Sequence, residues 1–109
     1  MRLQYTPQAI ADLQEIQTYI RHDLQNPQAA TRISKTILDS CAMLKDHPKI
    51  GFSLQAKIDR ETDLRCLVIG NYLAFYRAEG GVISVARILD GRQDYLQILF
   101  SNSKIDDQI

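Results

Sequence analysis

The spacing of apolar residues changes near the middle of this 109-residue chain, and that change constrains its fold class. In the first half, apolar residues recur three or four positions apart, which is the period of an amphipathic helix. From Leu64 onward they form short runs broken by Gly-Asn and Gly-Gly, which is typical of strands joined by tight turns. A helical half followed by a strand-rich half predicts an α+β domain.

The first half reads as a strand followed by two helices. Met1, Leu3 and Tyr5 alternate with polar residues, as in a half-buried strand. Thr6-Pro7 and Asn26-Pro27 each place an N-cap residue before a proline, which is a helix-start signal. The apolar stripes of the two helices are Ile10, Leu13, Ile16, Ile20 and Leu24, then Ala30, Ile33, Ile37, Cys41 and Leu44. Two helices of about 18 residues with a short turn between them predict an antiparallel hairpin that ends before Pro48.

The second half predicts an antiparallel sheet of three or four strands, with a short first strand around residues 54–58. Two-residue turns at Gly70-Asn71 and Gly80-Gly81 would pair Ile69 with Tyr72, Arg65 with Tyr76, Glu79 with Val82, Tyr76 with Val85 and Ala74 with Arg87. One face then carries Leu64, Cys66, Val68, Leu73, Phe75, Ala86 and Ile88, and we expect the helical hairpin to cover it. The other face carries Arg65, Leu67, Ile69, Tyr72, Ala74, Tyr76, Val85, Arg87 and Leu89.

After the sheet, Leu96, Leu99 and Phe100 predict one closing helical turn or a short extended segment. We expect a single domain over residues 1–100 and a polar, flexible tail over residues 101–109.

Composition excludes several classes of protein. The chain has 13 Lys and Arg against 13 Asp and Glu, so it lacks the basic excess of a general nucleic-acid binder. It has no apolar run of about 20 residues and no signal-peptide pattern, so we expect no membrane partner and a cytoplasmic location.

Cys41 and Cys66 lack CxxC spacing and are expected to be reduced core residues. His22 and His47 have no partner at metal-ligand spacing, so neither a metal nor a cofactor is predicted.

The strand-rich half has arginines but no lysine. Arg65, Arg77, Arg87 and Arg92 suit planar, bidentate contacts to phosphate, carboxylate or carbonyl groups. The alternative is that they pair with Glu79, Asp90 and Asp94, the acids of the same segment, or lie along the sheet edges. Tyr95 could act in acid–base chemistry only if arginines lowered its pKa, and otherwise it is a packing or surface residue. Asp12 and Glu15 share a helix face, which we interpret as solvated.

Several motifs in this order resemble the RelE/ParE superfamily of bacterial toxins over about residues 1–100. They are Ala9-x-x-Asp12-Leu13-x-x-Ile16-x-x-Tyr19-Ile20, Asn26-Pro27-x-Ala29-Ala30, Tyr72-Leu73-Ala74-Phe75-Tyr76-Arg77 and Arg87-Ile88-Leu89-Asp90-Gly91-Arg92-Gln93-Asp94-Tyr95. The resemblance implies a sheet flanked by a helical hairpin. It also implies a type II toxin, of the kind tied to plasmid stabilisation, that a cognate antitoxin wraps and neutralises.

The superfamily contains two activities. ParE-like members poison DNA gyrase, whereas RelE-like members cut mRNA on the ribosome without a metal. Neutral charge and a sheet without lysine favour the ParE-like activity, because a ribonuclease must enter ribosomal RNA and stabilise a charged phosphorane. The expected target-binding residues are Arg65, Arg77, Arg87, Arg92 and Tyr95, with no catalytic residue. In the nuclease alternative, Arg65, Arg87 and Tyr95 would be catalytic. A third alternative is an inactive relative that acts only as a binding module. The sequence departs from ParE relatives at Asp90, where they often have a basic residue or histidine.

Overall fold

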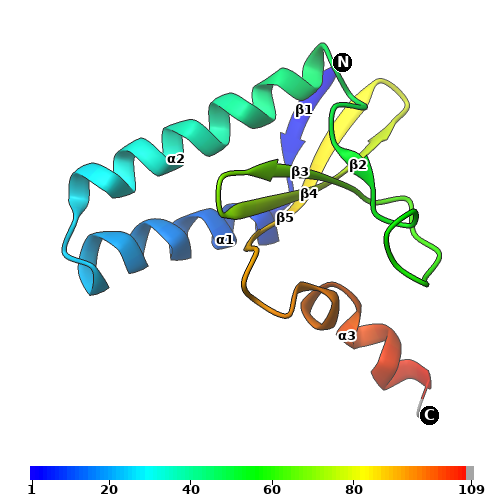
Figure 1. Cartoon of the computed structure of the whole chain (residues 1–109). Helices are drawn as coiled ribbons and strands as arrows, with labels where there is room; N and C mark the ends of the chain where they lie inside the picture. Colours follow the sequence, from blue (N-terminus) through cyan, green and yellow to red (C-terminus); the bar gives the residue numbers. More distant parts are fainter. Residues whose placement is uncertain (108–109) are drawn as a thin grey trace.

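A computed structural model of the chain describes residues 1–107, and side chains as far as Ser101. The elements are β1 (Arg2–Tyr5), α1 (Pro7–Thr18), the π-helical segment η1 (Tyr19–Asp23), α2 (Pro27–Ala42), the 3₁₀ turn η2 (Met43–Lys45), β2 (Phe52–Ser53), β3 (Arg65–Ile69), β4 (Tyr72–Glu79), β5 (Val82–Asp90) and α3 (Tyr95–Asp107). The predicted order of strand, helical hairpin and sheet is confirmed (Figure 1).

The two helices begin where the sequence predicts. The Thr6 hydroxyl accepts a hydrogen bond from the Ala9 N–H at 3.1 Å, and the Asn26 amide oxygen accepts one from the Ala29 N–H at 3.1 Å. Each cap precedes a proline in the first turn, where a missing N–H breaks no helical bond. Gln25, with a φ of 50°, lies in the turn between the helices.

The sheet has five strands in the order β1-β5-β4-β3-β2. Four of them follow the helical hairpin, as predicted, and the predicted N-terminal strand β1 joins the same sheet. β1 lies parallel to β5, and the remaining pairs are antiparallel. The prediction of a strand at residues 54–58 is wrong. The strand is Phe52–Ser53, and the following residues turn back on themselves, with the N–H groups of Lys57 and Ile58 both donating to the Leu54 carbonyl.

The predicted register holds up to a β-bulge and fails beyond it. Four predicted pairs are confirmed: Ile69 with Tyr72, Arg65 with Tyr76, Glu79 with Val82 and Tyr76 with Val85. Both glycines of the Gly80-Gly81 turn have positive φ, as a type I′ turn requires. Between Phe75 and Tyr76 the register then shifts, so that Ala86 has no partner and Ala74 pairs with Ile88 instead of Arg87.

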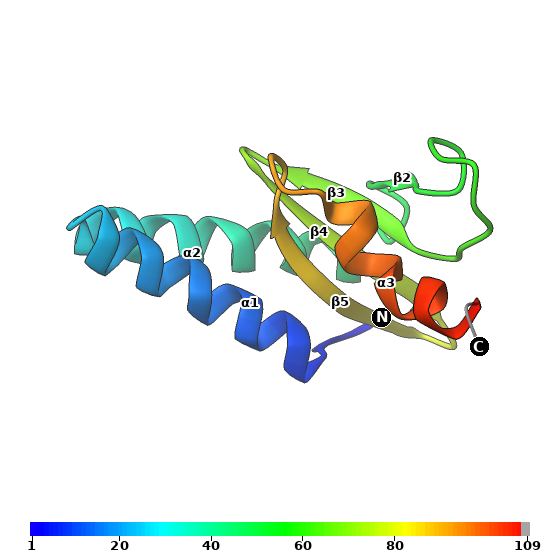
Figure 2. The same ribbon diagram turned by 90° about the horizontal axis from the view of Figure 1, so that it is seen from below.

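The helical hairpin covers the opposite face from the one predicted. It packs against a core that includes Ile69, Ala74, Tyr76 and Val85. The face with Cys66 and Phe75 is covered by α3 and by the segment that follows β2 (Figure 2). The prediction fails because both faces are covered, so an excess of apolar residues on one of them does not identify the side on which the hairpin packs.

α3 continues beyond the predicted closing turn and ends at Asp107, within the segment predicted to be a flexible tail. Residues 108–109 of that predicted tail lie outside the described residues. Flexibility of residues 101–109 remains a prediction.

Cys41 and Cys66 are both buried and free, which confirms their assignment to the core. Within residues 1–107, no helix is both long enough and apolar enough to cross a bilayer. In the same part of the chain, no group of three His, Cys, Asp or Glu residues is arranged to hold a metal ion.

Candidate functional site between α1 and the end of β5

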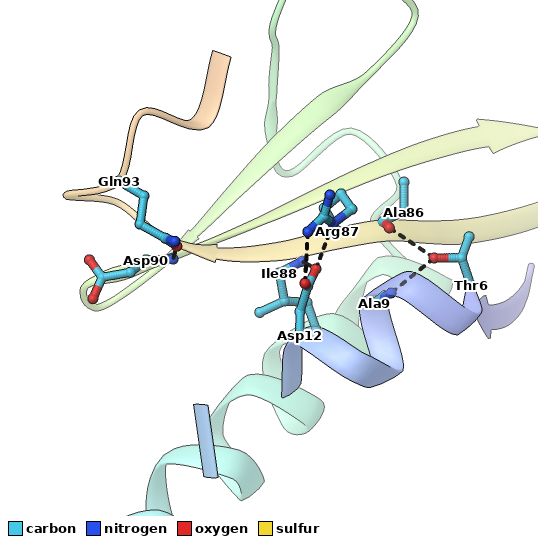
Figure 3. A network of polar contacts seen from close by, with 8 residues as sticks. All are labelled: Thr6, Ala9, Asp12, Ala86, Arg87, Ile88, Asp90 and Gln93. Atoms are coloured by element: carbon cyan, nitrogen blue, oxygen red, sulfur yellow. Dashed lines mark hydrogen bonds and ion pairs between the residues drawn. The ribbon is translucent and has the colours of Figure 1, made fainter. Parts of the chain in front are cut away.

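Asp12 anchors α1 to the sheet. Its carboxylate accepts hydrogen bonds from Arg87 Nε at 2.8 Å, Arg87 Nη2 at 2.9 Å and the Ile88 N–H at 2.9 Å (Figure 3). The Asp12 side chain is only 8% exposed, so the interpretation of this residue as part of a solvated face is wrong. Glu15, one turn along, does lie on the surface. The hydrogen bonds that Arg87 donates to Asp12 raise the pKa of Arg87, so its guanidinium stays charged.

A bulge in β5 lies next to these contacts. A bulge leaves one residue without a partner across the ladder, and here that residue is Ala86. The Ala86 carbonyl accepts a 2.8 Å hydrogen bond from the Thr6 hydroxyl, which also caps α1 (Figure 3). Thr6 and Asp12 therefore attach two successive turns of α1 to consecutive residues of β5.

A groove of about 460 Å³ runs over this pair. The Asp12–Arg87 pair lies on one side of it, and its other walls come from the end of α1, the start of β4 and the turn after β5. The lining residues are Asp12, Glu15, Ile16, Tyr19, Tyr72, Arg87, Ile88, Leu89, Asp90, Arg92, Gln93 and Ile98.

The turn after β5 is closed by Asp90. Its carboxylate accepts from Arg92 Nε at 3.0 Å and Nη2 at 2.7 Å, and also from the Arg92 N–H at 2.9 Å. The Gln93 side-chain oxygen accepts from the Asp90 N–H at 2.9 Å. The hydrogen bond from Arg92 lowers the pKa of Asp90, so this carboxylate is ionised at neutral pH. The Arg92 side chain is 81% exposed and therefore accessible to a partner.

Two tyrosines stand in the same groove. Tyr19 is the first residue of the π-helical segment and is half exposed, while Tyr72 opens β4. Burial raises the pKa of Tyr72, and the negative charge of Asp90 raises it further. The Tyr72 phenol is therefore neutral at pH 7. Both tyrosines carry a hydroxyl on an aromatic ring, which can donate and accept hydrogen bonds. π-Helical turns are frequent at functional sites.

Two of the predicted target-binding arginines lie outside the groove. Arg65 Nη2 donates to the Gly51 carbonyl at 2.6 Å and to the Lys49 carbonyl at 3.3 Å. Arg77 pairs with Asp63 at 2.7 Å on the surface. The structure therefore brings only Arg87 and Arg92 of the four together in one groove, and each of these already has a carboxylate partner.

Tyr95 also lies outside this groove. Its ring packs against Phe75, with the ring centroids 5.6 Å apart, in the core beneath α3. Its role as a target-binding residue remains a prediction, but its described contacts are those of a packing residue.

Sequence reasoning missed the contributions of Asp12, Tyr19 and Tyr72 to the groove. All three occur in the motifs that carry the RelE/ParE resemblance. An aspartate in the middle of an apolar helical stripe was the available signal, because a buried carboxylate requires a cationic or hydrogen-bonding partner.

A likeness to solved structures identifies the class of fold. The chain is similar to a chain in the structure of a chromosomal ParDE toxin–antitoxin system from P. aeruginosa, with a TM-score of 0.61 and 23% sequence identity. The likeness covers 83% of this chain and 95% of that one. The fold is therefore that of the RelE/ParE class, as the sequence motifs indicate.

The family follows from the sequence. A family model for the ParE toxin of the type II toxin–antitoxin system parDE matches residues 3–95. The chain belongs to the ParE toxin family. No curated protein matches it at a significant level.

Proposed function

We propose that this chain is the toxin of a type II toxin–antitoxin pair, that a cognate antitoxin neutralises it, and that it inhibits DNA gyrase instead of cutting mRNA. Membership of the ParE toxin family supports the general role. Both proposed partners would place the protein in the cytoplasm.

The observation that carries the choice of gyrase is the bidentate pairing of Arg87 with Asp12. A metal-free ribonuclease needs side chains that can move a proton and neutralise a phosphorane. Arg87 already uses two donors on a buried carboxylate. Tyr95 packs on Phe75, and Arg65 donates to backbone carbonyls. The three nuclease candidates are thus held by three separate structural contacts, and only Arg87 lines the groove.

The groups that a target can reach line the groove, and Arg92 among them is exposed although it pairs with Asp90. Tyr19 and Tyr72 lie beside Arg92. Aromatic residues and arginine are the side chains that most often dominate protein–protein binding. We therefore propose that Arg92, among the predicted target-binding residues, contacts the target directly, and that Arg87 acts by holding α1 in place.

The experiment is a pair of assays on the purified full-length protein. One measures supercoiling by DNA gyrase, and the other measures cleavage of mRNA on translating ribosomes. We expect dose-dependent inhibition of supercoiling with mRNA left intact, and a weaker effect of the Arg92→Ala variant at unchanged thermal stability. Cleavage of mRNA with normal supercoiling would overturn the gyrase proposal, and inactivity in both assays would support an inactive binding module.

A further inference from the structure

A second surface, separate from the groove, lies where the chain leaves α2. We call residues 43–50 the η2 corner. Its hollow, of about 530 Å³, is lined by Met43, His47, Pro48, Lys49 and Ile50. Met43 is 50% exposed and Ile50 is 49% exposed, so two large apolar side chains face solvent in one place. Neighbouring exposed apolar side chains are a feature of interaction sites.

The η2 corner is also basic. Lys45 and Lys49 form no ion pair within the part of the chain whose side chains are described, and Asp46 is the single acid among residues 43–50. Arg65 adds a third cation, because it donates a hydrogen bond to the Lys49 carbonyl. Three cations against one carboxylate give a local charge of about +2 in a chain whose net charge is zero.

The backbone of the η2 corner is held rigidly. The Tyr76 hydroxyl donates to the Pro48 carbonyl at 2.8 Å and accepts from the Gly51 N–H at 3.1 Å. Arg65 closes the same turn through the Gly51 carbonyl. A surface fixed in this way loses little conformational entropy when a partner binds.

We propose that the η2 corner docks an acidic, amphipathic segment of a partner polypeptide. Its apolar side chains would fill the hollow beside Met43 and Ile50, and its carboxylates would meet Lys45 and Lys49. The inference rests on the proposed function, in which this segment belongs to the neutralising antitoxin. A second copy of the chain fits less well, because a symmetric contact would set the lysines of one copy against those of the other.

This surface is distinct from the groove. The groove lies between α1 and the turn that leads to α3, whereas η2 is at the far end of α2, beside the N-terminus (Figure 1). No residue of the η2 corner lines the groove. Variants at the corner therefore test docking without altering the proposed target-binding residues.

The test uses a fluorescein-labelled peptide of leucine and glutamate, about 18 residues long so that it can form an amphipathic helix. Its controls are a peptide with lysine in place of each glutamate and a scrambled peptide. Binding to the full chain is measured by fluorescence anisotropy. The protein variants are Lys45→Glu/Lys49→Glu and Met43→Ser. The matched control is Arg32→Glu/Arg21→Glu, which reverses two exposed cations outside the corner.

We expect the acidic peptide to bind and the lysine and scrambled peptides to bind at least 10-fold more weakly. The Lys45→Glu/Lys49→Glu variant should weaken binding by roughly 10-fold or more, and the arginine control should change it less than about 3-fold. Met43→Ser should also weaken binding. Raising the salt to about 1 M, where the Debye length is about 3 Å, should reduce the difference between wild type and the double lysine variant.

Three results would overturn the proposal. Equal binding of the acidic and lysine peptides would show that apolar contacts alone drive binding and that the charge of the peptide does not matter. Unchanged binding in the lysine variant, or no binding of the acidic peptide, would place the docking surface elsewhere. Self-association of the chain that Met43→Ser abolishes would assign the corner to a second copy. The lysine variant should inhibit gyrase like the wild type, so a failed gyrase assay and a failed peptide assay are distinguishable outcomes.

Discussion

Removing either partner of the Asp12–Arg87 pair should lower the free energy of unfolding by several kcal/mol. Asp12→Ala removes a carboxylate that accepts three hydrogen bonds, and Arg87→Ala leaves that carboxylate buried with one donor, the Ile88 N–H. Removing one partner of a buried ion pair destabilises by about 3–5 kcal/mol. Because the Arg87 side chain is 21% exposed and water can approach it, we expect the lower end, about 3 kcal/mol, for Arg87→Ala.

Urea and thermal unfolding measure this loss. For a chain of this length, about 3 kcal/mol corresponds to a fall in Tm of roughly 12 °C or more. The double variant Asp12→Ala/Arg87→Ala should be more stable than the sum of the two single losses predicts, by about 2 kcal/mol, since it leaves no unpaired buried charge. The control is the surface pair of Arg77 and Asp63, whose side chains are 46% and 65% exposed. Arg77→Ala should change the free energy of unfolding by less than about 1 kcal/mol.

Two results would refute this reasoning. One is a loss below about 1 kcal/mol in both single variants, which would mean that the pair is solvated. The other is strict additivity in the double variant. The result also governs how toxicity is interpreted, because a loss of toxicity in Arg87→Ala has to be separated from a loss of folded protein.

Further predictions concern other parts of the fold and site. Gly51→Ala should lower Tm strongly, because an added Cβ would lie 2.5 Å from the Cys66 carbonyl oxygen. Burial raises the pKa of Cys41 and of Cys66 to about 11, so both thiols should resist alkylation at pH 8 until the chain unfolds. These two raised pKa values mean that the folded state retains protons that the unfolded state releases, so stability to urea should fall as the pH rises from about 9 to 11. Tyr95→Phe should leave growth inhibition nearly unchanged, whereas a loss of about 100-fold would indicate proton transfer by its hydroxyl.

Much of the fold could be predicted from local signals. Thr6-Pro7 and Asn26-Pro27 mark both helix starts, and a Gly-Asn and a Gly-Gly turn mark the two hairpins. The bulge at Ala86 has no such signal, because an extra apolar residue inside an apolar strand leaves the pattern unchanged. Parallel pairing of β1 with β5 was also missed, because nothing within Arg2–Tyr5 specifies the distant strand that it joins.

The candidate site was predicted only in part. The alternative that the arginines pair with acids of their own segment is confirmed for Arg92, which pairs with Asp90. Arg77 and Arg87 pair instead with Asp63 and Asp12. Asp63 and Asp12 lie outside the strand-rich segment, whose own acids are Glu79, Asp90 and Asp94. Long-range pairs of this kind depend on tertiary packing. Counting the charges along one segment therefore cannot predict which acid each arginine contacts.

The long sequence separation of the contacts between α1 and β5 affects the order in which the protein can form during synthesis. Thr6 contacts a residue 80 positions later, and Asp12 contacts one 75 positions later. At about 5–20 residues per second, a ribosome needs roughly 4–16 s to extend the chain from one anchor to the other. During that interval β1 has no partner strand and the Asp12 carboxylate has no cation. A chain stalled before Val82 therefore lacks all of β5 and cannot assemble the groove, so premature termination yields products without the proposed target-binding surface.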